Sequence, residues 1–129
     1  MIGRILLAVD DSAPAFAAAD LAIELAQTLT AELRAVTVAE EGHLPDRVLG
    51  AVASRARRAG VRVETVTLAD GMPPFELTLA EADRWGADLV VMGRSDQRRL
   101  GPAYVGSQTS RLLEFAEIPV LVVPGPAPG

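Results

Sequence analysis

Short, fully apolar runs alternate along the chain with longer segments whose apolar residues recur every three or four positions. Such runs are typical of strands covered on both faces, and the longer spacing is typical of helices packed on one side. Runs of this kind predict strands at Ile5–Val9, Ala87–Met92 and Val120–Val123, and Leu33–Val38 is also predicted to be a strand. Val61–Leu68 alternates apolar and polar residues at its start, which is typical of a half-exposed or edge strand. The predicted helices run from Ser12 to about Leu29, from Pro45 to Gly60, from Pro73 or Pro74 to Gly86, and from Ser107 to about Ala116.

The apolar stripes of these helices predict which residues face the sheet. The stripes are Ala18, Leu21, Ala22, Leu25 and Leu29; Val48, Leu49, Val52, Ala56 and Ala59; Phe75, Leu79, Ala82 and Trp85; and Leu112, Leu113 and Ala116. Ser12 is a favourable N-cap for the first helix. Gly60 and Gly86 are expected to end the second and third helices, since glycine favours the left-handed conformation found there.

The strict alternation of strands and helices predicts an α/β fold with an open parallel sheet and right-handed crossovers. The length of 129 residues fits one domain, which we assign to residues 1–124, followed by a disordered Pro- and Gly-rich tail, 125–129. In such sheets, ligands bind beyond the carboxyl ends of the strands, where the strand order reverses. The loops Asp10–Ser12 and Gly93–Val105 would be neighbours there if the first and fourth strands are adjacent.

Composition narrows the class of protein. A net charge of −5 argues against nonspecific nucleic-acid binding, which needs a basic surface. The chain has no Cys, which excludes disulfides and thiolate metal sites, and no cluster of other ligands predicts a metal-only site. No apolar run approaches the length that crosses a membrane, so a cytoplasmic protein with no membrane partner is expected.

The loop after the fourth predicted strand carries the strongest candidate chemistry. It contains glycine, and Gly106-Ser107 then opens a helix, whose first backbone N–H groups are unpaired and carry partial positive charge. This arrangement predicts an anion or nucleotide site. The turn Asp10–Ser12 holds no glycine and the chain has no Lys, so the dinucleotide fingerprint and the P-loop are both absent.

The spacing of this loop resembles that of the universal stress protein family. Nucleotide-binding members carry Gly, two residues, Gly, nine residues, Gly, then Ser or Thr, and Gly93, Gly106 and Ser107 match in register. Asp96 stands where the middle glycine would be. Four further segments are similar to the family's strands: Ile5–Ser12 (ILLAVDDS), Val36–Glu41, Gly86–Gly93 and Ile118–Pro124.

The resemblance implies an adenine nucleotide alpha hydrolase-like fold, with strand order 3-2-1-4-5 and two helices on each face. It also implies a homodimer formed through the last strand, Val120–Val123. This strand is uniformly apolar and bounded by prolines, and an apolar sheet edge invites pairing with a second copy. The alternative is that the tail folds over that edge.

The resemblance further implies an ATP or AMP site, with Mg²⁺ arriving on the nucleotide. Adenine and ribose would lie at Ala8, Val9 and Asp10, with Val38 against the base. The phosphates would lie between the strand end and the helix start, at Met92, Gly93, Asp96, Gly106, Ser107, Gln108 and Thr109. Two alternatives stay open, because Ser107 could be a plain N-cap and Asp10 could cap the first helix.

Asp96 departs from the family pattern and brings a negative charge to the proposed phosphates. Two like charges ~4 Å apart repel by about 1 kcal/mol in water and by more in a partly buried cleft. The flanking Arg94, Arg98 and Arg99 could neutralise Asp96 or hold phosphate themselves. The alternative is a solvated charged loop.

Three functions are consistent with the sequence. The first is a dimeric, cytoplasmic stress-response protein regulated by adenine-nucleotide occupancy, with no catalytic residue. The second is a family branch in which Asp96 excludes ATP and the protein works through protein–protein contacts. The third is a slow nucleotide hydrolase, for which Asp96 and His43 are the candidate bases, although nothing brings His43 toward Asp10 and Ser107.

Overall fold

A computed structural model describes residues 1–39, 44–69, 71–94 and 107–125. The strands are β1 (Arg4–Ala8), β2 (Glu32–Val38), β3 (Val63–Leu68), β4 (Leu89–Gly93) and β5 (Val120–Val123). The helices are α1 (Ala13–Leu29), α2 (Pro45–Arg58), α3 (Pro74–Trp85) and α4 (Ser107–Phe115). The predicted alternation of strands and helices is confirmed, with boundaries that differ by one or two residues.

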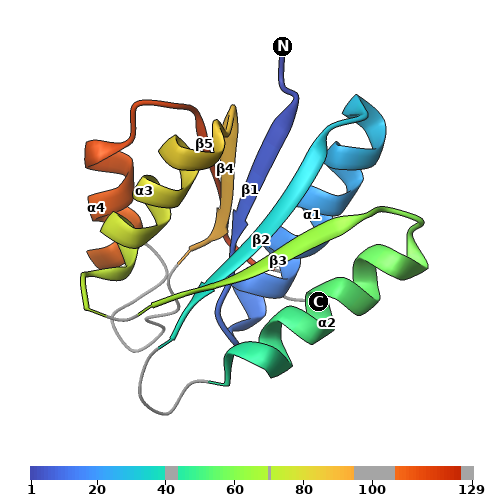
Figure 1. Cartoon of the computed structure of the whole chain (residues 1–129), viewed down its shortest axis with the longest axis horizontal. Coiled ribbons are helices and arrows are strands. Elements are labelled where there is room, and N and C mark those ends of the chain that lie inside the picture. The colour runs from blue at the N-terminus through green and yellow to red at the C-terminus, as the bar shows by residue number, and fades with distance from the viewer. Residues whose placement is uncertain (40–43, 70, 95–106, 126–129) are drawn as a thin grey trace.

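The five strands form one parallel sheet in the order β3-β2-β1-β4-β5, as the family resemblance implied. Helices α1 and α2 share a core with one face of the sheet, and α3 and α4 share a second core with the other (Figure 1). From β1 the chain continues into α1 on one face, whereas from β4 it continues into α4 on the other. The strand order therefore reverses between the carboxyl ends of β1 and β4, and this place is called the switch point below.

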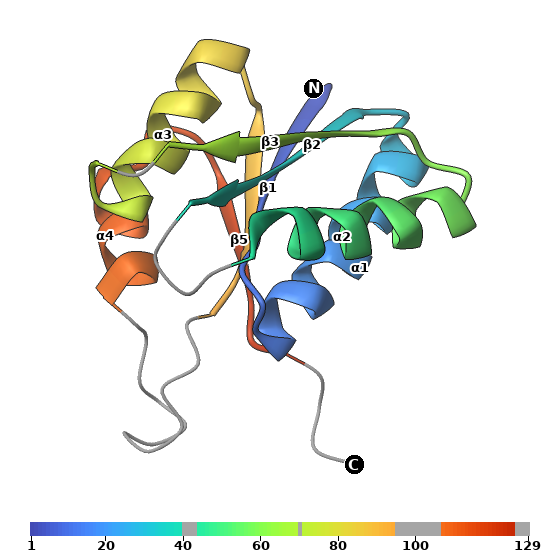
Figure 2. The same ribbon diagram turned by 60° about the horizontal axis from the view of Figure 1, so that its bottom comes forward.

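Helix ends follow the local chemistry of the sequence. The Ser12 hydroxyl accepts a hydrogen bond from the Ala15 N–H at 3.3 Å, which confirms the predicted N-cap of α1. Gly60 and Gly86 have positive φ angles of 72° and 81°, and they lie just beyond α2 and α3 as predicted. Figure 2 shows that the helices start near the carboxyl ends of the strands, at one edge of the sheet.

The buried side of α1 is rotated relative to the predicted stripe. The buried residues are Pro14, Ala15, Ala18, Ala19, Ala22, Ile23 and Ala26. Leu21 and Leu25 are half-buried, and Leu29 is 44% exposed, so its predicted inward position is wrong. Most of these buried side chains are small, and small side chains let a helix approach its neighbours closely. Leu25 packs at the margin of that contact.

The inward face of α4 also differs from its prediction. Leu112 is 1% exposed, but Leu113 is 48% exposed, so the expectation that both face inward is wrong. Successive residues of a helix are separated by about 100°, so one of two adjacent leucines must turn away from a flat contact. Thr109 is fully buried three residues before Leu112, and these two residues define the buried side of α4.

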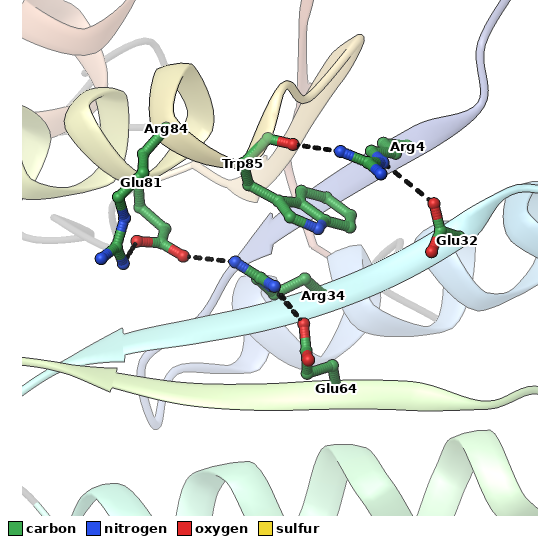
Figure 3. A network of polar contacts seen from close by, with 7 residues as sticks. All are labelled: Arg4, Glu32, Arg34, Glu64, Glu81, Arg84 and Trp85. Carbon is green, nitrogen blue, oxygen red and sulfur yellow. Dashed lines mark hydrogen bonds and ion pairs between the residues drawn. The ribbon is translucent and has the colours of Figure 1, made fainter.

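A network of charged side chains links α3 to β1, β2 and β3 on the second face (Figure 3). Arg34 on β2 pairs with Glu81 of α3 at 2.7 Å and also with Glu64 of β3. The guanidinium groups of Arg34 and Arg4 lie 4.7 Å and 5.6 Å from the centre of the Trp85 ring. Glu81, which the sequence does not single out, is only 3% exposed.

Candidate functional site

The ends of β1 and β4 lie side by side at the switch point. Ala8 and Met92 are register partners, and the next residue of β4, Gly93, packs against the first turn of α1. A Cβ atom at Gly93 would lie 2.5 Å from the Pro14 carbonyl carbon and 2.6 Å from the Ala15 nitrogen. In the part of the chain that the structure describes, the starts of the two predicted ligand loops are therefore neighbours.

Asp10 shapes the turn between β1 and α1. Its Oδ1 accepts a hydrogen bond from the Ser12 N–H at 2.9 Å, an Asx turn that sets up the N-cap at Ser12. Asp10 is exposed, and its carboxylate lies just beyond the end of β1. Capping of α1 is thus performed by Ser12, and Asp10 presents a negative charge at the switch point.

Val9 is turned away from the α4 side of the sheet. Its side chain is 7% exposed and belongs to the core shared with α1 and α2. Its N–H donates to the Val36 carbonyl at 3.0 Å, and its carbonyl accepts from the Thr37 hydroxyl at 2.7 Å. Val9 therefore holds β1 against β2, a role that the sequence does not reveal.

Three apolar residues form a partly open surface on the α4 side of the switch point. Ala8, Val38 and Met92 come from the carboxyl ends of β1, β2 and β4, and each is half-buried against the α3–α4 core. We call these three residues the apolar floor. Together with the exposed Asp10, they offer apolar contact for a flat ring and a hydrogen-bond acceptor for hydroxyl groups.

The start of α4 is tied to the start of α3. Gln108 Oε1 accepts a hydrogen bond from the Phe75 N–H at 3.0 Å, and the Thr109 side chain is fully buried. Both residues were predicted to contact phosphate. In the structure the side-chain oxygen of Gln108 bonds α3, and the side chain of Thr109 lies in the core. Gly106, Asp96, His43, Arg98 and Arg99 lie outside the described residues, and Ser107 is described as the first residue of α4.

The contact between Phe75 and Gln108 is a feature that sequence reasoning missed. A signal was present, because α3 begins at Pro73-Pro74 and proline supplies no side-chain cap. The first N–H groups of that helix therefore need an acceptor from elsewhere. The sequence does not say which element supplies it, because the pairing of α3 with α4 is tertiary.

Other classes of site find little support in the described ranges. Those residues contain no group of three or more His, Cys, Asp or Glu side chains placed to hold a metal ion. None of the described helices is long and apolar enough to cross a membrane.

Comparison with known proteins agrees with this geometry. Residues 1–124 match the model of the universal stress protein family. The chain belongs to that family. It is 30% identical to a universal stress protein of Methanocaldococcus jannaschii, over 95% of this chain and 82% of the relative.

Two solved universal stress proteins are similar in fold. The first is a crystal structure in complex with cAMP; it has a TM-score of 0.82 and 22% identity, over 97% of this chain and 98% of the other. The second is a protein of Archaeoglobus fulgidus in complex with dAMP, with a TM-score of 0.74 and 22% identity, over 96% and 98%. At this identity the likeness shows a shared fold, and each ligand belongs to the protein in which it was seen.

Proposed function

We propose that this universal stress protein binds an adenine nucleotide at the switch point and acts as a cytoplasmic regulator of the stress response. The observation that carries the proposal is that the apolar floor, the exposed Asp10 and the start of α4 all lie toward the carboxyl edge of the sheet (Figure 1). A base can pack on the apolar floor, and a ribose can bond Asp10. Phosphates can approach the first N–H groups of α4. Structural relatives that hold cAMP and dAMP support an adenine ligand.

The nucleotide is AMP or ATP, with Mg²⁺ carried on the phosphates. The decisive experiment is a thermal scan of the purified protein with AMP, ADP, ATP and adenosine. A ligand at a hundredfold its dissociation constant adds roughly 2.7 kcal/mol to the free energy of unfolding. Absorbance of the deproteinised sample tests for carried-over nucleotide. If none of the four compounds raises the unfolding temperature at millimolar concentration, nucleotide binding is rejected. The remaining function is then the one that works through protein–protein contacts.

Asp10 offers a matched pair of variants. Asp10→Asn keeps an oxygen for the Ser12 N–H but removes the negative charge from the proposed ribose contact. We expect it to weaken AMP binding about tenfold, as for loss of a charge-assisted hydrogen bond. Asp11→Asn makes the same change at the exposed neighbouring position and should leave affinity unchanged. Equal effects of the two variants on AMP affinity would show that Asp10 is not part of the binding site.

Asp96 tests which nucleotide is preferred. If its charge repels a triphosphate, Asp96→Gly should strengthen ATP binding more than AMP binding, because more charge lies beyond the first phosphate. An equal change for both nucleotides would rule out that explanation. The proposed role is binding and regulation; phosphate release above background that is abolished by Asp96→Ala would establish a hydrolase instead.

The proposed assembly is a homodimer paired through β5. This strand lies at the edge of the sheet, and its four apolar residues are all half-buried. Carbonyls of Pro119 and Val123 accept from Val90 and Arg94. Alternate residues of a strand bond to the same neighbour, so the N–H of Val122 faces the outer edge.

Val122→Pro removes an N–H from the outer edge and leaves the pairing of β5 with β4 in place. We expect this variant to sediment as a monomer, whereas Val122→Ala sediments as a dimer. A wild-type protein that sediments as a monomer would reject the assembly. So would a Val122→Pro dimer of unchanged affinity.

A further inference from the structure

Gln108 supplies to α3 the cap that its own sequence lacks. The N-cap position of α3 is Pro73, which makes no side-chain hydrogen bond, and the first helical residue is Pro74, which has no N–H. The first N–H that needs an acceptor is therefore that of Phe75. Gln108, the second residue of α4, provides this acceptor at 3.0 Å. The starts of α3 and α4 are thus joined by one hydrogen bond.

Phe75 also holds the far end of α4. Its ring stacks on the ring of Phe115, with centroids 5.8 Å apart and planes inclined by 18°. Phe115 follows Gln108 by seven residues, which is about two helical turns and places both on the same side of α4. Leu112 lies between them and belongs to the same buried cluster as Phe75. We call Phe75, Gln108 and Phe115 the α3–α4 clamp.

The clamp fixes the direction in which α4 points. Figure 1 shows α3 and α4 side by side, with the start of α4 toward the carboxyl edge of the sheet. Hydrogen bonds from helix N–H groups to an anion weaken steeply as their angle departs from linear. A small rotation of α4 would therefore weaken contact with a phosphate more than contact with the apolar floor and Asp10, which belong to the strand ends.

From this arrangement we infer that the Gln108 side chain positions the start of α4 for the nucleotide phosphate, acting through Phe75 and not by side-chain contact with the ligand. The inference rests on the proposed function, because it assumes that phosphate binds at the start of α4. By linkage, a phosphate that favours the clamped orientation must in turn strengthen the bond between Phe75 and Gln108. AMP should therefore protect the Phe75 amide from hydrogen exchange more than adenosine does.

Binding of AMP and adenosine by three variants separates the alternatives. Gln108→Leu removes the acceptor, Phe115→Leu removes the ring stack at a distance from the ligand, and Ser110→Ala is a control at an exposed position of α4. Both clamp variants should weaken AMP binding, Gln108→Leu by about fivefold and Phe115→Leu by less. The affinity for adenosine should change by less than about twofold in both variants. Ser110→Ala should change neither.

Each outcome has a distinct meaning. A wild-type protein that binds neither compound defeats the proposed function and this inference with it. A wild-type protein that binds AMP, with unchanged affinity in Gln108→Leu, defeats the positioning role alone. Loss of AMP affinity in Gln108→Leu but not in Phe115→Leu would show that Gln108 contacts phosphate directly. Should the variants fail to fold, exchange of the Phe75 amide in the wild-type chain decides: equal protection by AMP and adenosine at equal saturation overturns the inference.

Discussion

Gly93 lies so close to the first turn of α1 that an added Cβ atom would approach the carbonyl carbon of Pro14 to 2.5 Å. The atoms in the way are backbone atoms, which cannot move aside as a flexible side chain can. Gly93 is also the first glycine of the family's loop pattern. Close packing of α1 on β4 is therefore a sufficient physical reason for glycine at this position, whether or not phosphate binds beyond it.

Replacement of Gly93 by alanine should strain the contact between β4 and α1. We expect Gly93→Ala to lower the free energy of unfolding by about 3 kcal/mol, as for overpacking against groups that cannot relax. Urea unfolding measures the change. Gly50→Ala is the matched control, because a Cβ there meets no atom within 4 Å and Gly50 lies inside α2. That control should gain up to about 1 kcal/mol from helix propensity. Equal stability of the two variants would contradict the packing argument.

The order of elements could be predicted because each strand and helix carries a local pattern. Continuous apolar runs marked β1, β4 and β5, and Gly60 and Gly86 marked the ends of two helices. The rotation of α1 could not be predicted, because alanines and leucines both count as apolar. Which of them faces the sheet depends on how closely α1 must approach β1 and β4.

The candidate site was predictable in outline and not in its contacts. The neighbouring ends of β1 and β4 follow from topology, which a sequence pattern and a family resemblance can indicate. The roles of Val9, Thr37 and Gln108 depend on hydrogen bonds between elements far apart in the chain. Such bonds leave no periodic trace in the sequence.

The buried carboxylate of Glu81 should make the protein sensitive to loss of Arg34. The Glu81 side chain is 2% exposed and pairs with Arg34 at 2.7 Å. Among the described residues, Arg34→Met would leave this charge paired with Arg84 alone, whose side chain is 74% exposed. We expect a loss of about 3 kcal/mol in the free energy of unfolding. Arg84→Met, the control, should lose less than about 1 kcal/mol, because the Arg84 side chain is exposed and Glu81 keeps its pair with Arg34. A similarly small loss of stability in Arg34→Met would show that the buried Glu81 carboxylate does not depend on Arg34.

Asp88 should contribute stability that disappears in acid. Hydrogen bonds from the N–H groups of Gly3, at 2.8 Å, and Arg4, at 3.0 Å, lower the pKa of the Asp88 carboxyl below its ordinary value of 3.8. A group whose pKa is lower in the folded state stabilises the fold above the unfolded pKa. That contribution is lost as the pH falls through the folded pKa.

The comparison of wild type with Asp88→Asn isolates this effect. The difference in stability between them should be constant from neutral pH down to the approach of 3.8, and should then shrink as the pH falls further. Chemical denaturation at a series of pH values measures it. Parallel stability curves through the acid range would show that the carboxylate is not held by these amides.

Thr30 closes α1 in a conformation that costs stability. Its φ and ψ angles of 53° and 45° are left-handed, and it is the single non-glycine residue with positive φ in the described ranges. A β-branched residue is strained there, whereas glycine at the end of a helix is not. Thr30→Gly should therefore raise the free energy of unfolding by about 1 kcal/mol. Thr28→Gly, two residues earlier in the last turn of α1, should instead lower it by about 0.5 kcal/mol, because glycine weakens a helix. Thermal unfolding of both variants measures the difference, and a loss of stability in Thr30→Gly would show that the left-handed cap is unstrained.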